Sequence, residues 1–128
     1  MTQRPVAESD HVTQAWWDAT RRATFLVQTC EGCAHRQHYP RALCTACGST
    51  RLGWTEGSGR ATVYSFTIVR RAPHPAFDPP YVVALLRLDE GPTILSTIVR
   101  GEPKCDARAT LEWEDLPDGR KLPVFAME

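Results

Sequence analysis

The sequence has no excess of either charge, because 15 lysines and arginines balance 15 aspartates and glutamates in 128 residues. Proteins that bind nucleic acid through its phosphates usually carry a surplus of positive charge, so this balance argues against a general nucleic-acid binder. No apolar run approaches the roughly 18 residues of a membrane span. Nothing at the N-terminus resembles a secretory signal peptide. We therefore expect a cytoplasmic protein that does not enter a membrane.

The chain also lacks the sequence patterns of common catalytic sites. No serine, histidine and acid can be placed as a triad, and no glycine-rich phosphate loop follows a strand and opens a helix. Acidic clusters at 89–90 and 112–115 occupy turn and exposed-strand positions, where solvated carboxylates are ordinary. Cys105 has no histidine or helix N-terminus nearby to activate its thiol, which favours a bystander over a nucleophile. We expect no catalysis by this chain alone.

Four other cysteines follow a definite pattern. Cys30 and Cys33 form one Cys-x-x-Cys pair, and Cys44 and Cys47 form a second pair ten residues further on. This spacing lets both sulfurs of a pair turn toward one point, and four thiolates suit tetrahedral Zn²⁺ with Zn–S bonds of about 2.3 Å. A closed Cys₄ site has no open position for water or substrate. The pattern therefore predicts a structural zinc site.

Other interpretations of the four cysteines are weaker. Disulfides need an oxidising compartment, and a thioredoxin-type pair needs a βαβ unit that the sequence does not show. Iron in a rubredoxin-type site uses the same four sulfurs, so ligand type leaves iron open. His35 and His38 lie between the pairs, but the cysteines already complete a tetrahedron, and we expect both imidazoles to face solvent or form hydrogen bonds. The region has few large apolar side chains, so metal must supply much of its folding free energy.

A helix is predicted before the cysteines, from about Asp10 to Ala23, with Ser9 or Asp10 as its N-cap. One stripe at helical spacing contains Val12, Ala15, Trp16, Ala19 and Ala23. Trp17 lies about 100° from this stripe, so the helix presents aromatic surface on two sides. Two interpretations have equal weight. Either both tryptophans pack in the core, or Trp16 and Trp17 form part of a partner interface, where tryptophan is enriched as an energetic anchor.

The pattern changes to β-structure after a flexible run at 56–59. Strands are predicted at 61–70, 81–88, 93–100, 107–113 and 122–126, and a short one at 25–28 precedes the first cysteine pair. The strand at 61–70 has apolar or β-branched residues on both faces, so we expect it to be largely buried or curled. Five strands with regular turns favour a small closed or partly open barrel, above all a five-stranded OB-fold. We divide the chain into a helix and zinc ribbon, 10–55, and an OB-fold domain, 56–128.

The order of these features resembles the family called domain of unknown function 35 (DUF35), from about residue 15 to 126. The matching motifs are Trp16-Trp17, Cys30-Glu31-Gly32-Cys33, Tyr39-Pro40-Arg41, Cys44-Thr45-Ala46-Cys47-Gly48-Ser49, Gly59-Arg60-Ala61-Thr62-Val63-Tyr64-Ser65, Pro80-Tyr81, Leu88-Asp89-Glu90-Gly91 and Leu122-Pro123-Val124-Phe125. The resemblance implies a mainly β protein in which an N-terminal helix and a rubredoxin-like Cys₄ zinc ribbon precede an OB-fold barrel. Cys105 departs from the family pattern, which tends toward an apolar residue there.

The resemblance also implies a function, that of a non-catalytic accessory protein in acyl-coenzyme A chemistry. Such proteins bind thiolase-superfamily enzymes, including thiolases, hydroxymethylglutaryl-CoA synthases and lipid-transfer-protein-like aldolases that act on sterol side chains. Some relatives work with a hotdog-fold hydratase. The implied role is to complete the partner's active-site entrance and to hold or pass the acyl-CoA thioester, with zinc as the cofactor.

Some residues of the chain have the chemistry to contact coenzyme A, as this role requires. Thirteen of the 15 basic residues are arginine, whose planar guanidinium can bind phosphate through two hydrogen bonds. Arg70 and Arg71 end the first barrel strand and Arg100 ends the third, so the three could meet a CoA phosphate if these strand ends share one rim. His74 and Phe77, in the proline-rich loop 71–80, could contact an acyl chain or a partner. For the arginines, scattered solvated charge is the favoured alternative.

Two other functions stay open at this point. A single-stranded nucleic-acid binder is the main alternative, because OB-folds and zinc ribbons both serve that purpose. Against it stand the zero net charge and the absence of a run in which basic residues cluster with aromatics. The third is a free-standing enzyme with an unrecognised site.

Overall fold

The computed structural model describes residues 5–128, and its N-terminal part holds one helix and a three-stranded sheet. Helix α1 (Gln14–Thr20) precedes strands β1 (Leu26–Cys30), β2 (Arg36–Gln37) and β3 (Leu52–Glu56). The strand order is β2-β1-β3, with both pairings antiparallel. The first cysteine turn therefore follows β1, and the second cysteine turn precedes β3. The sequence analysis missed β2 and β3, since one has two residues and the other contains a glycine.

Helix α1 is shorter than the predicted 10–23. The Asp10 carboxylate accepts hydrogen bonds from the N–H groups of Val12 and Thr13, at 3.0 and 2.9 Å, and so closes a turn before the helix. The N-cap is Thr13 rather than Ser9 or Asp10, and Ala23 leaves helical geometry with a φ of 52°. Among the described residues, no helix has the length and hydropathy needed to cross a membrane.

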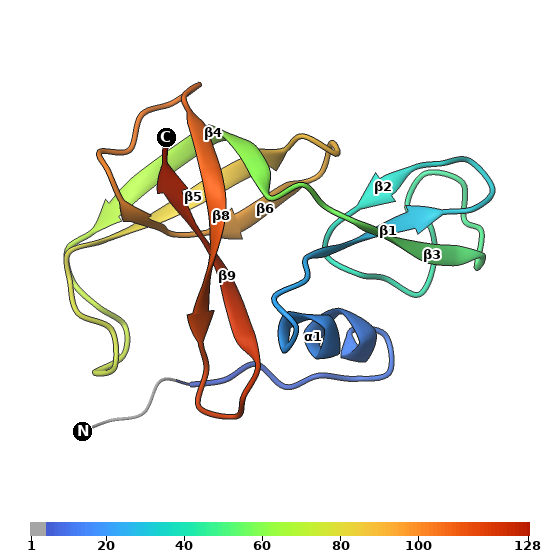
Figure 1. Ribbon diagram of the computed structural model, residues 1–128, viewed down its shortest axis with the longest axis horizontal. Helices are drawn as coiled ribbons and strands as arrows, with labels where there is room; N and C mark the ends of the chain where they lie inside the picture. Colours follow the sequence, from blue (N-terminus) through green and yellow to red (C-terminus); the bar gives the residue numbers. More distant parts are fainter. Residues whose placement is uncertain (1–4) are drawn as a thin grey trace.

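The second sheet has six strands: β4 (Arg60–Val69), β5 (Tyr81–Leu88), β6 (Thr93–Ser96), β7 (Ile98–Arg100), β8 (Arg108–Asp115) and β9 (Lys121–Met127). Their order is β6-β5-β4-β8-β9-β7. β6 and β7 stand at opposite ends of this order, although Thr97 alone separates them in the chain, so the sheet curls strongly (Figure 1). This is the predicted OB-fold, with the strand expected at 93–100 divided in two.

The curled sheet is the partly open form of the predicted barrel, with six strands where five were expected. β4 pairs with β5 along most of its length but with β8 only through residues 60–62. The second half of β4 therefore projects beyond the curled part, and Tyr64 and Ile68 on it are exposed. The expectation of a largely buried strand holds only for its first half, where Ala61 and Val63 are in the core.

One hydrophobic core joins the helix, the zinc ribbon and the OB-fold sheet. It includes Trp16, Trp17, Phe25, Val27, Val63, Leu86, Ile94 and Phe125. Figure 1 shows α1 between the two sheets, beside β9. Because these residues come from all three parts, the ribbon is packed onto the OB-fold rather than tethered to it. The division into units 10–55 and 56–128 stays a prediction.

Two buried polar residues fasten α1 to the β8–β9 hairpin. The Thr20 hydroxyl donates to the main-chain oxygen of Trp17 at 2.6 Å and accepts from the N–H of Lys121 at 3.2 Å. The Arg120 guanidinium lies 4.6 Å from the centre of the Trp17 ring and donates to the main-chain oxygen of Ala7 at 2.6 Å. Both residues are buried, so their contacts hold the helix and the preceding segment in one place.

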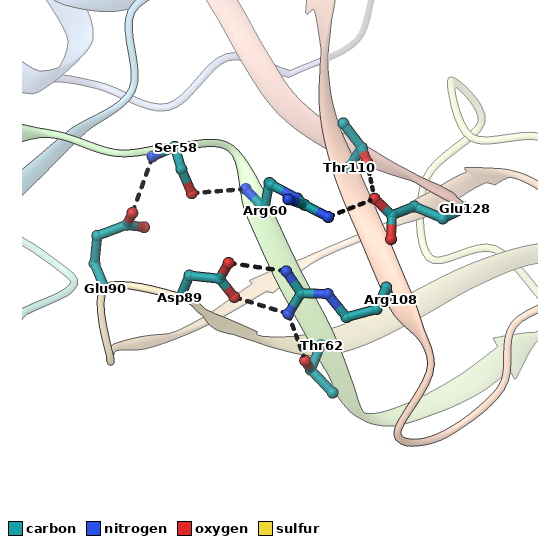
Figure 2. A network of polar contacts seen from close by, with 8 residues as sticks. All are labelled: Ser58, Arg60, Thr62, Asp89, Glu90, Arg108, Thr110 and Glu128. Carbon is teal, nitrogen blue, oxygen red and sulfur yellow. Dashed lines mark hydrogen bonds and ion pairs between the residues drawn. The ribbon is translucent and has the colours of Figure 1, made fainter.

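A polar network holds the linker between the two sheets (Figure 2). The Glu90 carboxylate accepts from the N–H of Ser58 at 3.0 Å, and Arg36 of the ribbon donates to the main-chain oxygen of Glu90 at 3.4 Å. Asp89 accepts two hydrogen bonds of 2.8 Å from Arg108, which lower the pKa of Asp89. Asp89 is exposed, as expected, and Glu90 is half-buried, but both also form contacts that link the ribbon, the β5–β6 turn and β8.

Candidate functional site

The four cysteines of the two knuckles converge on one point. Cys30 ends β1 and Cys33 lies in the turn that follows, while Cys44 and Cys47 occupy a second turn before β3. All four sulfurs lie within 4.8 Å of one another, with 3.7 Å between Cys30 and Cys47 and 3.6 Å between Cys33 and Cys44. Four sulfurs bound tetrahedrally to zinc at 2.3 Å are about 3.8 Å apart. The arrangement fits Zn²⁺, and these four residues hold it.

Main-chain N–H groups favour the thiolate form of these cysteines. The N–H groups of Gly32 and Cys33 donate to the Cys30 sulfur at 3.3 and 3.4 Å. The bond from Cys33 is the main reason that the pKa of Cys30 falls to about 6, and the N–H of Cys47 lowers the pKa of Cys44 in the same way. Since a thiolate binds the metal, one cysteine of each knuckle, Cys30 and Cys44, is favoured in the binding form, whereas burial and the neighbouring sulfurs raise the pKa of Cys33 to about 12 in the metal-free site. Four sulfurs leave no open position, which makes the zinc structural.

Two buried glutamines hold the segment between the knuckles. Gln37 donates to the side-chain oxygen of Gln28 at 2.7 Å, and Gln28 exchanges two hydrogen bonds with the main chain of Arg41, at 2.8 and 2.9 Å. The oxygen of Gln37 accepts from the N–H of Thr45 at 2.9 Å. Sequence reasoning missed this pair because glutamine is usually exposed. The cross-strand register of β1 and β2, which places Gln28 opposite Gln37, is visible only in the structure.

The two histidines of this segment have different surroundings. His35 forms a hydrogen bond with the Thr45 hydroxyl at 3.1 Å, as expected. His38 instead stacks on Phe25, with ring centroids 5.9 Å apart, and lies 5.6 Å from the Trp16 ring. Burial lowers the pKa of His38 to about 4. The expectation of a solvent-facing or hydrogen-bonded imidazole is wrong for His38, because the helix covers it.

Helix α1 places both tryptophans in the same aromatic cluster. The Trp16 ring meets the Trp17 ring edge to face at 4.8 Å and also contacts Phe25 and Tyr39, at 5.7 and 5.8 Å. Trp16 is 3% exposed and Trp17 is 4% exposed. These values favour the core interpretation of the two side chains. A role of Trp16 and Trp17 in a partner interface stays a prediction.

An apolar groove of about 830 Å³ runs over the OB-fold sheet beside this cluster. Its floor is formed by β5 and β6, its walls by the loop at 76–78 and the β8–β9 hairpin, and Trp16 and Tyr39 contribute at the helix side. In OB-folds, this face of the second and third strands, between these two loops, is the usual ligand-binding surface. Leu95 on the groove is 69% exposed, and Leu85 and Val99 are exposed beside it. A surface of this kind is typical of a binding site.

The structure brings only some of the predicted contact residues to this groove. Phe77 lines it, and the His74 ring lies 5.7 Å from the Phe77 ring. Arg70 and Arg71 are exposed after the end of β4, and Arg100, at the end of β7, forms an ion pair with a glutamate of β8. None of the three arginines lines the groove. Their contact with a CoA phosphate stays a prediction, as does the acyl contact of His74 and Phe77.

The charged residues of the groove are acidic. Asp78 and Glu114 line it, and no lysine or arginine of residues 5–128 does so. A nucleic-acid strand needs cations along its phosphates. The face that binds oligonucleotides in other OB-folds is thus unsuited to them here, which weakens the nucleic-acid alternative.

A Cys₄ ribbon packed on a curled OB-fold sheet defines a class of small scaffold proteins. Residues 17–53 match the model of the ChsH2 rubredoxin-like zinc ribbon domain, and residues 54–114 match that of the ChsH2 C-terminal OB-fold domain. A DUF35 domain-containing scaffold protein of Pyrococcus furiosus is 31% identical over 94 residues, which cover 73% of this chain and 68% of the relative. The chain belongs to the DUF35 family.

Two further relatives connect the chain with enzymes. A "Probable enoyl-CoA hydratase alpha subunit" of Thermomonospora curvata is 33% identical over 125 residues, or 95% of this chain. The chain spans only 39% of that relative's length. The solved structure of an "Ltp2-ChsH2(DUF35) aldolase" matches with a TM-score of 0.86 and 31% identity, covering 97% of this chain and 98% of the other. A DUF35 protein from Sulfolobus solfataricus, at 17% identity and a TM-score of 0.70, shares the fold.

Proposed function

We propose that this chain is a non-catalytic accessory subunit of an enzyme that processes acyl-CoA thioesters. The partner is a thiolase-superfamily enzyme, either a thiolase, a synthase or a lipid-transfer-protein-like aldolase, and a hotdog-fold hydratase is a second possible associate. The chain helps to hold or channel the acyl-CoA substrate, in cytoplasmic lipid metabolism that includes steroid side-chain degradation. The apolar groove on the OB-fold sheet is the observation that carries this proposal.

The described part of the chain brings no reactive set of side chains together, which supports the accessory role. The zinc is enclosed by four cysteines, so it has no position for a substrate. In the groove, the Ser96 hydroxyl donates to the main-chain oxygen of Pro123 at 2.8 Å rather than to a base. His38 is the one histidine among the described lining residues, and aromatic rings enclose it. Cys105 lies outside the groove, in the loop before β8.

The names of the relatives support an enzyme partner. One relative is named as the alpha subunit of a hydratase, and the solved structure is named as an aldolase that contains Ltp2 and ChsH2(DUF35). Exposed apolar surface of the kind seen at Leu85, Leu95 and Val99 gains about 25 cal/mol for each Å² that a partner removes from water. The shared core of ribbon and OB-fold holds this surface rigid, which lowers the entropy lost on binding.

Co-expression with a thiolase-superfamily enzyme from the same genome tests the proposal. We expect the two proteins to elute together in size-exclusion chromatography, and the enzyme to be insoluble or inactive alone. Leu85→Glu should abolish co-elution because it places a charge in the apolar groove. Leu43→Glu should not, because Leu43 is equally an exposed leucine but lies on the ribbon away from the groove. A fully active enzyme that elutes separately would refute the proposal.

A further inference from the structure

We propose that the free edge of β6 binds an extended segment of the partner enzyme as an additional β-strand. This inference rests on the accessory function proposed above and specifies how the partner is held. β6 is the last strand of the sheet order and pairs with β5 alone, so no strand within residues 5–128 pairs with its second edge. Every residue of β6 lines the groove. A strand that enters the groove therefore meets main-chain groups as well as apolar side chains.

The hairpin between β5 and β6 determines which main-chain groups face the free edge. The N–H of Leu88 donates to the oxygen of Pro92 at 2.8 Å, which begins the series of hydrogen-bonded pairs. Hydrogen-bonded and non-hydrogen-bonded pairs alternate along an antiparallel ladder. Two residues further along, Ile94 bonds with Leu86 of β5, whereas Thr93 and Leu95 belong to the other set. The N–H and C=O groups of Thr93 and Leu95 therefore point away from β5.

β9, the strand on the other side of the groove, has no unpaired main-chain N–H at Lys121, Pro123 or Phe125 for an added strand. β9 is connected through its edge to the rest of the protein, since the N–H of Lys121 donates to the hydroxyl of Thr20 at 3.2 Å. Pro123 has no N–H, and its oxygen accepts from a serine hydroxyl of β6 at 2.8 Å. The N–H of Phe125 donates to the main chain of Thr97 at 3.0 Å. The partner segment therefore pairs with β6.

The sequence of β6 also leaves this edge open to a new strand. Exposed edge strands are usually protected by being very short, or by lysine, proline, a bulge or an inward charge, which prevents unwanted pairing. β6 has only four residues, which limits an added strand to a short segment, but it reads Thr-Ile-Leu-Ser without lysine, proline or charge, and its register with β5 contains no bulge. A short edge without blocking residues, beside exposed apolar surface, fits a strand that is covered by a short segment of a partner.

The groove specifies the chemistry of the segment. Leu95 receives apolar side chains from alternate positions of an added strand, since side chains of a strand alternate between its faces, and Leu85, opposite Leu95 on β5, extends the same apolar face. Asp78, which lines the groove, is acidic and complements a lysine or arginine that flanks those apolar residues. Four added residues span about 13 Å, the length of β6. The occupant is a short extended peptide with apolar residues and a flanking base.

An acyl chain alone is a poorer occupant of this site. It would cover the leucines of the groove, but it would leave the N–H and C=O groups of Thr93 and Leu95 without partners in an apolar setting, which is unfavourable. An added strand satisfies those groups and buries the same apolar surface. This mode of binding, addition of a strand to a sheet edge, is common in peptide recognition.

A proline variant tests the main-chain contacts. Leu95→Pro removes the N–H that faces the groove and leaves the bonds between β6 and β5 in place, because proline is tolerated on the open side of an edge strand. Leu95→Ala is the matched control, since it keeps the N–H and shortens the side chain. In co-expression with a tagged thiolase-superfamily enzyme and an equal amount of wild-type chain as competitor, we expect at least about tenfold less Leu95→Pro than Leu95→Ala to be recovered with the enzyme. Equal recovery of the two variants would overturn the inference.

Amide hydrogen exchange at residue resolution tests the same contacts without a variant. The amides of Thr93 and Leu95 should exchange rapidly in the free chain and become protected in the complex, while Ile94 should be protected in both. A complex in which Thr93 and Leu95 still exchange rapidly would overturn the strand addition and leave the accessory function standing. If no complex forms at all, both proposals fail.

Two further outcomes would assign the edge to another occupant and so overturn the inference. Protection of Thr93 and Leu95 that rises with the concentration of the chain alone would show pairing with a second copy. Protection by octanoyl-CoA alone, without the enzyme, would show that the acyl ligand occupies the groove.

Discussion

Acidification should destabilise this protein through His38. The imidazole is enclosed by the rings of Phe25, Trp16 and Tyr39, and burial lowers the pKa of His38 from 6.5 to about 4. In the unfolded chain, the same imidazole is in water and binds a proton with a pKa of about 6.5. Below that pH, protonation favours the unfolded chain, because the folded state keeps His38 neutral.

The direction and size of the effect follow from proton linkage. Because the folded pKa is below the unfolded one, the contribution of His38 to stability is complete above pH 6.5 and is lost as the pH falls from 6.5 to about 4. With these two values, the free energy of unfolding falls by about 2 kcal/mol between pH 7.5 and pH 5 at 25 °C. This is a large part of the stability of a small domain, which is on the order of 5–15 kcal/mol.

Urea unfolding of the zinc-loaded protein at pH 7.5 and pH 5 measures this loss. His38→Phe keeps an aromatic ring in place but cannot titrate, so it should lose about 2 kcal/mol less than the wild type over the same interval. Protons also compete with zinc for the thiolates, but that effect is common to both proteins and cancels in the difference. His11→Gln, at an exposed histidine, should follow the wild type. Parallel losses in the wild type and His38→Phe would refute the argument.

Two further predictions concern the zinc and the docking of the helix. We expect elemental analysis to give one zinc ion per chain for the wild type and less for Cys44→Ser. Amide exchange should show residues 26–56 unprotected in Cys44→Ser, because zinc-ribbon folding draws on a metal-binding free energy of roughly 10–16 kcal/mol. Cys105→Ser, at an exposed free cysteine, should keep both zinc and protection. A metal-free chain with an intact ribbon would contradict this. Thr20→Val should lower the free energy of unfolding by about 1–3 kcal/mol in a denaturant titration, because it leaves the partly buried N–H of Lys121 without its acceptor. The control is Thr24→Val, which should lower it less, because the Thr24 hydroxyl makes only a 3.3 Å bond to the adjacent turn. Equal losses in the two variants would show that the Lys121 contact has no role in stability.

Elements that depend on neighbouring residues were predictable. β5 begins at Tyr81 and ends at Leu88, as expected from its apolar run and the turn after it. The two Cys-x-x-Cys pairs were sufficient to predict the zinc site, because each knuckle is a local turn whose geometry follows from its spacing. The resemblance to DUF35 proteins then predicted the ribbon and OB-fold in the right order, which the family models and the fold confirm.

Errors arose where a distant segment decides the environment of a residue. Helical periodicity placed Ala15 on the buried stripe, but Ala15 is exposed and Thr20 is buried, since β9 packs on that side of the helix. His38 was expected to be hydrogen-bonded or in water, but α1 covers it with Trp16. Asp89 is exposed, as expected, but its ion pair with Arg108 was not foreseen, and Glu90 is half-buried beside Ser58 rather than in solvent.

The sequence by itself determined the four-cysteine metal site, the order of the elements and the family, because these depend on spacing and local pattern along the chain. Only the tertiary structure decided that the helix, ribbon and sheet share one core, that Phe77 and Leu95 line one groove, and that the arginines at 70, 71 and 100 lie outside it. It also decided that β6 has an unpaired edge, because the sheet curls and the N–H groups at the edge of β9 bond to Thr20 and Thr97. Such features depend on which strands pair with each other across long stretches of sequence, and no local sequence pattern specifies that pairing.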